Sequence, residues 1–255
     1  MAIRVTMLGS GTSTGVPVIG CPCKVCTSDN PRNRRWRPGL KLEINGCIAL
    51  VDTSTDLREQ ALRFGLPRLD AILFTHAHAD HIFGLDDVRI FNFRQRSPIP
   101  CYGSDLTLQA IRRIFSYVFE ETQAGGGKPQ LDLIGIREPF RLLGREIVPV
   151  PVWHGDLEVF GYRIGSFAYV TDCNRIPEES LELLDGVETL ILDALRYRPH
   201  STHFSVEEAI AVAERIGSSR TIFTHLAHEI DYGAPAVPFP PGMEFGYDGL
   251  VFEVD

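Results

Sequence analysis

Residues 74–84 read FTHAHADHIFG, and this stretch decides the fold. The apolar run LDAILFT predicts a buried strand, and its end carries four candidate metal ligands into one loop: His76, His78, Asp80 and His81. Imidazole and carboxylate groups suit borderline divalent metals such as zinc. His76 and His78, two positions apart, can turn to one metal ion. Asp80 and His81 can reach a second one, so the order H-x-H-x-D-H predicts metal binding.

The same arrangement, an apolar run that ends in a histidine or an aspartate, recurs along the chain. The strand-end residues of this kind outside 74–84 include His154, Asp172 and His225. Loops at strand ends gather functional groups in α/β proteins. Any one of these residues alone fits a capped turn, whereas the series supplies the further ligands that a binuclear centre needs.

Short strands and helices are mixed along the chain. Apolar, β-rich runs predict strands over 3–8, 40–44, 47–52, 69–75, 146–153, 167–172, 189–194, 221–225 and 250–254. Helices are predicted over 54–64, 104–119 and 205–217. The last has Ser205 and Glu208 in capping-box spacing. No linker rich in Pro, Gly or Ser divides the chain, so one α/β domain over 1–255 is expected.

The composition limits the classes of function. The net charge of −8 disfavours a protein whose whole surface grips long polyanions. No run approaches the roughly 18 apolar residues of a membrane helix. The six cysteines and the lack of a recognisable secretory leader predict a cytoplasmic protein, with free or metal-bound thiols rather than disulfides.

Three of the cysteines fall within residues 20–26, GCPCKVC. Three thiolates do not complete a tetrahedral metal site, so these residues either form part of a disulfide framework or have a fourth ligand elsewhere. The remaining cysteines lie in or beside apolar segments and are expected to be buried free thiols: Cys47, Cys101 and Cys173. The spacing by itself leaves both interpretations of the triplet open.

Taken in order, the histidine and aspartate motifs resemble those of the metallo-β-lactamase family of hydrolases. The family's series of a strand-end Asp, H-x-H-x-D-H, His, Asp and His matches Asp52, 76–81, His154, Asp172 and His225. The resemblance implies an α/β fold, an αββα sandwich of two mixed β-sheets with helices on the outer faces. It assigns two divalent cations, zinc or manganese, to two ligand sets that Asp172 bridges: His76, His78 and His154, and Asp80, His81 and His225. Asp52 is implied to orient the ligand loop.

A narrower subfamily, the phosphoribosyl cyclic phosphodiesterases of the PhnP type, resembles the chain over nearly its whole length. The matching segments are GTSTGVPVIGCPCKVC (11–26), FTHLAHEID (223–231) and PPGMEFGYDGL (240–250). His225 is taken up by the binuclear site, which leaves His228 to supply the missing fourth ligand. The resulting structural zinc site would consist of Cys21, Cys23, Cys26 and His228. Such a closed site has no open position, and we expect it to fasten the N-terminal loop to the loop of His225.

The resemblance implies two-metal hydrolysis of a small, cyclic phosphodiester by a hydroxide that bridges the cations. The chain has no G-x-S-x-G elbow, in line with a reaction that needs no side-chain nucleophile. By resemblance, His203 contacts phosphate or protonates the leaving group, and His200 is a second candidate for substrate contact. Asp80 is expected to combine a catalytic part with metal binding.

Three rivals share parts of the pattern. A ribonuclease Z shares the metal motifs, but the flexible insert QAGGGKPQ (123–130), a predicted surface loop, is short for an arm that grips tRNA. A glyoxalase II-like thioesterase has no evident use for the cysteines. The pyrroloquinoline-quinone synthesis protein B, an accessory protein, has a similar cysteine cluster. The expected partners are a small phosphodiester and, by resemblance, a second copy in a homodimer, with no membrane and no nucleic acid.

Two further stretches stand out. GSGTSTG (9–15) follows a strand but lacks the Lys-Ser/Thr ending of a nucleotide P-loop, so we expect a tight loop packed near the active site. RNRRWRPG (32–39) places four arginines around Trp36. In an acidic chain these arginines are expected to be solvated or paired with carboxylates, and a local role in steering phosphate stays open.

Overall fold

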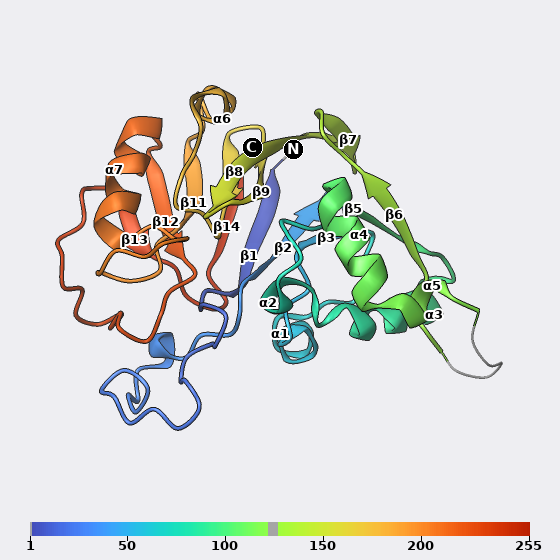
Figure 1. Ribbon diagram of the computed structural model, residues 1–255, viewed down its shortest axis with the longest axis horizontal. Helices are drawn as coiled ribbons and strands as arrows, with labels where there is room; N and C mark the ends of the chain where they lie inside the picture. The colour runs from blue at the N-terminus through green and yellow to red at the C-terminus, as the bar shows by residue number, and fades with distance from the viewer. Residues whose placement is uncertain (1, 122–126) are drawn as a thin grey trace.

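Two β-sheets lie face to face in the computed structural model, which describes residues 2–121 and 127–255, with helices on both outer sides (Figure 1). The strand order is β14-β1-β2-β3-β4-β5-β6 in the first sheet and β13-β12-β11-β10-β9-β8-β7 in the second. Each sheet combines three antiparallel and three parallel pairings. The predicted αββα sandwich of two mixed sheets is therefore confirmed.

The elements are short, as expected for a layered α/β fold. The first sheet contains β1 (Ile3–Gly9), β2 (Gly39–Ile44), β3 (Cys47–Val51), β4 (Ala71–Leu73), β5 (Ile99–Gly103), β6 (Leu131–Gly135) and β14 (Val251–Val254). The second contains β7 (Phe140–Leu142), β8 (Arg145–His154), β9 (Leu157–Ile164), β10 (Phe167–Val170), β11 (Thr189–Asp193), β12 (Arg220–Thr224) and β13 (Met243–Phe245). The α-helices are α1 (Leu57–Phe64), α2 (Ala79–Ile82), α3 (Arg89–Gln95), α4 (Asp105–Ile114), α5 (Ser116–Phe119), α6 (Glu178–Leu183) and α7 (Val206–Ile216). Two 3₁₀ turns are η1 (Pro31–Asn33) and η2 (Leu85–Val88).

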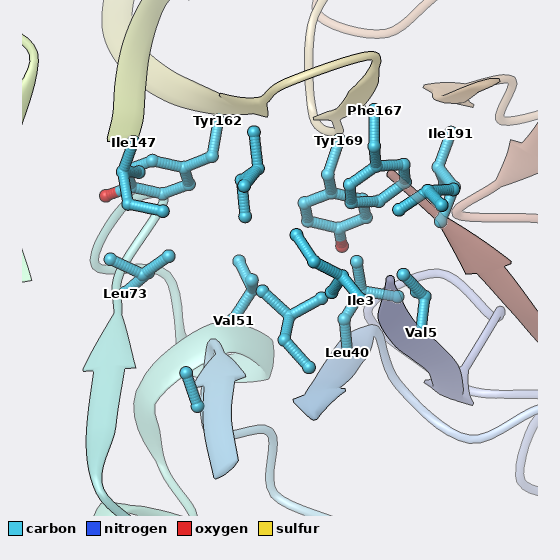
Figure 2. Close-up of a cluster of buried hydrophobic side chains, with 14 of the residues drawn as sticks. Ile3, Val5, Leu40, Val51, Leu73, Ile147, Tyr162, Phe167, Tyr169 and Ile191 are labelled. Carbon is cyan, nitrogen blue, oxygen red and sulfur yellow. The ribbon is translucent and has the colours of Figure 1, made fainter. Parts of the chain in front are cut away.

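An apolar core fills the space between the two sheets (Figure 2). Leu40, Val51 and Leu73 of the first sheet face the aromatic rings of Tyr162 and Tyr169 of the second, and all five side chains are buried. Burial of one large apolar side chain contributes about 1.5–3 kcal/mol. Two further apolar layers attach α1, α3 and α4 to the first sheet and α7 to the second. This packing fixes the strand ends from which the candidate ligands project.

The sequence patterns identified nine of the fourteen strands in the described part of the chain and missed β5, β6, β7, β9 and β13. Pro100 interrupts the apolar run of β5, Gly161 interrupts that of β9, and β7 and β13 have only three residues each. The helix predicted over 104–119 is instead two helices, because Phe115 leaves the helical conformation with φ −104° and ψ 42°.

Other expectations on local structure hold. The capping box of Ser205 and Glu208 is present at the start of α7, and Gly217 ends the helix in a left-handed conformation with φ 76°. Of the loop expected at 123–130, residues 123–126 lie outside the described residues. Over the described ranges, the helices all fall short of the length and apolarity that a bilayer crossing requires.

Gly9 and Gly11 allow two chain segments to approach each other closely. A Cβ atom on Gly9 would lie 1.9 Å from the carbonyl oxygen of Arg37, and one on Gly11 would lie 2.9 Å from the Cβ of Arg35. The Gly11 N–H donates to the carbonyl of Trp36 at 2.8 Å. The glycine-rich loop 9–15 is thus a tight loop that holds the arginine-rich segment against the end of β1.

Replacing Gly9 by Ala tests this contact. The added methyl group has no room, so we expect Gly9→Ala to lower the free energy of unfolding by about 2 kcal/mol or more. Gly39→Ala is the matched control, because Gly39 pairs with Gly9 in the sheet and its nearest neighbour would lie 3.7 Å from the new Cβ. Denaturant unfolding should separate the two variants. Equal stability of both would contradict the proposed close approach.

Candidate active site

The candidate ligands converge at one edge of the sandwich, where strands of both sheets end. The first sheet supplies Asp52 after β3 and residues 76–81 after β4, and the second supplies His154, Asp172 and His225 from β8, β10 and β12. Three of these residues adopt the left-handed conformation: Asp52 (φ 63°), Asp172 (φ 53°) and His225 (φ 62°). Such a conformation costs about 1–3 kcal/mol and persists only where the surroundings enforce it. Its recurrence here marks the site as a region shaped for function.

One donor group consists of three imidazoles. The ligand nitrogens of His76, His78 and His154 all lie within 4.8 Å of one another. His154 donates from Nδ1 to the carbonyl of Thr202 at 2.8 Å, which leaves its Nε2 free to face the group. Burial lowers the pKa of His76 well below its usual value, and burial also lowers the pKa of His78. Both imidazoles therefore stay neutral, the form that binds metals.

A second donor group lies beside the first and is buried throughout: Asp80, His81, Asp172 and His225. The carboxylate of Asp172 lies 3.3 Å from His81 Nε2 and 3.2 Å from His225 Nδ1. It also lies 4.0 Å from His76 Nε2, so it reaches toward the first group. Burial alone would raise the pKa of Asp172, but His225 and His81 hold it well below its usual value. Asp172 is thus an ionised carboxylate between the two groups.

Among the residues that the structure describes, four buried atoms at this place have no hydrogen-bond partner: His76 Nε2, Asp80 Oδ2, His81 Nε2 and His225 Nδ1. Buried polar atoms in folded proteins are almost always satisfied, so a set of unsatisfied ones in contact calls for a missing partner. Nitrogen and carboxylate oxygen together suit zinc, manganese or iron. The donor set therefore fits the two divalent cations that the sequence predicts.

Asp52 contacts the loop that carries the ligands His76 and His81. Its carboxylate lies 2.7 Å from His81 Nδ1, and it accepts hydrogen bonds from the backbone N–H and the hydroxyl of Thr75, both at 2.8 Å. The Thr75 hydroxyl oxygen also lies 3.0 Å from His76 Nδ1. These contacts turn Nε2 of both imidazoles toward the donor groups. The orienting role expected of Asp52 matches this geometry, and Thr75 is a partner that the sequence patterns did not reveal.

His203 lies at the rim of the donor groups and is held by Asp193, which the sequence analysis missed. Its Nδ1 is 3.2 Å from both carboxylate oxygens of Asp193, and its ring stacks on His225 with centroids 4.7 Å apart. Burial alone would lower the pKa of His203, but Asp193 raises it to about 9. Asp193 ends β11 as the other candidate aspartates end their strands, so the same signal could have identified it.

His200 is farther from the donor groups than His203. Its ring centroid lies 5.2 Å from that of His203, and its Nδ1 faces the backbone N–H of Thr202 at 3.3 Å. Burial lowers its pKa. Of the two histidines in segment 198–205, only His203 belongs to a cluster of ligand atoms, with His154 and Asp172.

The three N-terminal cysteines meet His228. Its Nδ1 lies 3.3 Å from Cys21 Sγ, 3.5 Å from Cys23 Sγ and 3.6 Å from Cys26 Sγ. Tetrahedral zinc with sulfur at about 2.3 Å and nitrogen at about 2.0 Å places each sulfur roughly 3.5 Å from the nitrogen, so the four residues fit a zinc ion. All three thiols are unpaired with any other cysteine.

His225 and His228 face different sites, and the backbone of His225 is left-handed (φ 62°). Between them, Leu226 forms a β-bridge with Gly11. His225 consequently faces the binuclear donor groups, whereas His228 faces the cysteines. Residues 225–228 therefore connect the two candidate metal sites, with one ligand at each end.

A family model described as the beta-lactamase superfamily domain matches residues 49–226, which include all the candidate ligands of the binuclear site. A crystal structure described as a new diphosphatase from the PhnP family shares 41% identity and a TM-score of 0.91, over 100% of this chain and 98% of that chain. The Zn²⁺-bound PqqB from Methylobacterium extorquens shares 21% identity and a TM-score of 0.78, over 98% of this chain and 100% of that chain, and so resembles it in fold.

A protein named octanoyltransferase from Porphyromonas gingivalis is 37% identical over 99% of this chain. The chain spans about half of that relative, 52% of its length, so the named protein has a further half without a counterpart here. From the matched family model and the full-length similarity to the PhnP-family structure, we conclude that the chain belongs to the beta-lactamase superfamily of hydrolases and, within it, to the PhnP family.

Proposed function

We propose that the protein hydrolyses small phosphodiesters, cyclic ones above all, with two divalent cations at the converging donor groups. The observation that carries the proposal is the set of buried, unsatisfied nitrogen and oxygen atoms that meet at two adjacent places. Leaving them without partners would be costly, and cations satisfy them. The similarity to a PhnP-family diphosphatase supports phosphate chemistry.

The ligand assignment follows the two groups. One cation would be held by His76, His78 and His154, and the other by Asp80, His81 and His225. Asp172 would contact both cations, because its two oxygens face both groups. Bound there, the cations supply Lewis-acid stabilisation of phosphoryl oxygens and activate water. The chain's own contribution is to hold its donors rigid before substrate arrives, through Asp52, Thr75 and the Thr202 carbonyl.

His203 is the proposed proton donor or phosphate contact. Asp193 accepts from its Nδ1, which leaves Nε2 directed away from Asp193. The ring lies between His154 and His225, with centroids 4.6 Å and 4.7 Å away, and therefore borders both donor groups. A group placed there can reach the leaving oxygen of a diester held by the cations. Asp80 acts through metal binding and through the field of its carboxylate at the second group.

Cys21, Cys23, Cys26 and His228 are proposed to bind a third, structural zinc ion. The role is structural because a four-ligand site has no position for substrate. This ion would tie the N-terminal loop to the segment that carries His225. The sulfur–nitrogen distances of 3.3–3.6 Å support the assignment.

A glyoxalase II-like thioesterase is the second candidate, and the relative named octanoyltransferase, of which this chain spans 52%, makes an octanoyl group the acyl chain to test. Ribonuclease Z-like cleavage of tRNA and an accessory role like that of pyrroloquinoline-quinone synthesis protein B remain the other rivals. Each predicts a different outcome in one panel of substrates: an octanoyl thioester, a tRNA precursor, or no turnover of any of them.

The first test measures hydrolysis of 2′,3′-cyclic, 3′,5′-cyclic and 1,2-cyclic ribosyl phosphates after chelation and restoration of zinc or manganese. We expect cleavage of at least one diester, and a loss of about 10³-fold or more in Asp172→Ala, because that change removes the carboxylate shared by both cations. Asp185→Ala, an exposed acid, is the control and should keep full activity. Cleavage of the thioester or tRNA but of no cyclic diester would contradict the proposal.

The second test concerns His203. His203→Ala should lower kcat by about 10²–10⁴-fold, because a positioned acid contributes that much, while the metal content stays unchanged. His200→Ala is the matched variant and should have a smaller effect. Metal analysis and steady-state kinetics on the same preparations check both points. Loss of metal from His203→Ala would instead make this residue a ligand.

The third test concerns the cysteine cluster. Cys21→Ser should remove one metal ion per chain and lower the Tm by about 5 °C or more, since a structural ion contributes folding energy. Cys47→Ser, a free thiol outside the cluster, should keep both the metal and the Tm. Full metal content in Cys21→Ser would rule out the structural zinc site.

A further inference from the structure

A cavity of about 790 Å³ opens beside the N-terminal loop and contains none of the proposed metal ligands. Residues of the segments 14–19 and 31–37 line it, together with Asp56, Arg63, Tyr247 and Asp248. These segments come from the two ends of the chain and from both ends of α1, with Asp56 before its first residue and Arg63 in its last turn. The cavity is therefore a built feature of the fold.

The cavity concentrates positive charge. Five of its lining residues are arginines, Arg32, Arg34, Arg35, Arg37 and Arg63. Its two carboxylates already have partners, and one of these partners is the lining residue Arg37. Asp56 pairs with Arg37 at 3.0 Å, and Asp248 accepts from the N–H groups of Ser10 at 2.9 Å and Trp36 at 2.6 Å. The cavity is lined by more positive than negative side chains, whereas the whole chain has a net charge of −8, so the attraction for an anion is local to the cavity.

Two of the arginines remain available to a ligand. Within the residues that the structure describes, neither Arg34 nor Arg63 forms an ion pair, and both are exposed. Arg35, by contrast, is buried and donates to the carbonyls of Ala227 and Ile230, so it serves the loop. The expectation for the arginines of 32–39 thus holds for the exposed Arg32 and Arg34 and for the paired Arg37, and it is wrong for Arg35.

Aromatic rings stand beside these cations. The guanidinium of Arg63 lies 5.3 Å from the ring centroid of Trp36, and that of Arg32 lies 4.2 Å from the ring centroid of Tyr247. A guanidinium binds phosphate oxygens with paired hydrogen bonds, and an indole face stacks on a planar ring. The cavity wall therefore offers guanidinium groups for the phosphate of a nucleotide and an aromatic ring for its base.

The cavity adjoins the metal-ligand cluster through a single stretch of chain. Gly11 donates to the carbonyl of Trp36 on one side and forms a β-bridge with Leu226, the residue after His225, on the other. Two strand spacings separate the backbones of Trp36 and Leu226, roughly 10 Å. A ligand that extends over the Gly11 segment would reach from the cavity to the metal-ligand cluster.

We propose that this cavity is a second substrate subsite that binds the anionic, ring-bearing end of a nucleotide, while the metal cluster takes the phosphodiester to be cleaved. Arg34 and Arg63 bind a phosphate of the ligand, and Trp36 stacks on its base. The assignment of the ligand as substrate rests on the proposed function, whereas nucleotide binding by the cavity does not.

The experiment titrates adenosine 5′-monophosphate into the metal-loaded protein by calorimetry, with adenosine and inorganic phosphate as separate probes. We expect one site per chain, and at least tenfold weaker binding of each separate probe. Arg34→Ala, Arg63→Ala and Trp36→Ala should each weaken the nucleotide about tenfold. Arg112→Ala is the matched control, because Arg112 lies 4.6 Å over Phe119 on another helix and should leave the affinity unchanged.

His76→Ala distinguishes the two sites, since it should abolish hydrolysis and leave nucleotide binding intact. Failure of the nucleotide to bind below about 1 mM, or affinity that His76→Ala removes and Arg63→Ala does not alter, would overturn the inference. Arginine-dependent binding without any diester hydrolysis would leave the cavity assignment standing and refute the proposed function. Hydrolysis of a diester without arginine-dependent nucleotide binding would refute the cavity assignment and leave the proposed function standing.

Discussion

Ionised groups buried together at the edge where two sheets meet are the constraint on which the rest of the structure depends. His81 lies within 3.3 Å of the carboxylates of Asp52, Asp80 and Asp172. Burial alone would lower the pKa of His81, but these three carboxylates raise it well above its usual value. One imidazolium does not satisfy the unpartnered atoms around it, and charges removed from water are tolerated only when paired. The two divalent cations proposed above would supply the missing positive charge, and the cation at the second donor group would take the place of the proton on His81.

The two sheets serve this cluster in a similar way. Each sheet has a run of four parallel strands, β3-β4-β5-β6 and β10-β11-β12-β13. The candidate ligands follow strands of these runs, except His154, which ends the antiparallel strand β8. The cost of left-handed backbone at Asp52, Asp172 and His225 is met by the apolar layers that hold these strands. The core between the sheets therefore supports the ligand geometry as well as the fold.

Much of the site could be predicted from the sequence, because each ligand follows a recognisable apolar run and the H-x-H-x-D-H order is specific. Asp193 also ends an apolar strand, but it is not part of the metallo-β-lactamase series of motifs and was therefore overlooked. The separation of His225 from His228 depended on the bridge between Gly11 and Leu226, a contact that residue spacing does not encode. The arginine cavity was out of reach for the same reason, since it depends on Asp248 binding the backbone of Trp36, 212 residues away in the chain.

The N-terminal loop connects the cysteine cluster, the arginine cavity and the segment that begins at His225. Arg35 binds the carbonyls of Ala227 and Ile230, which flank His228, while the neighbouring Trp36 lines the cavity. A change at the cysteine cluster can thus reach both the cavity wall and the segment that begins at His225.

The most direct measurement of the central claim is anomalous X-ray diffraction from crystals of the metal-loaded protein. The account predicts two neighbouring peaks, one among His76, His78 and His154 and one among Asp80, His81 and His225, with Asp172 in contact with both. A single peak at this edge, or none, would contradict it.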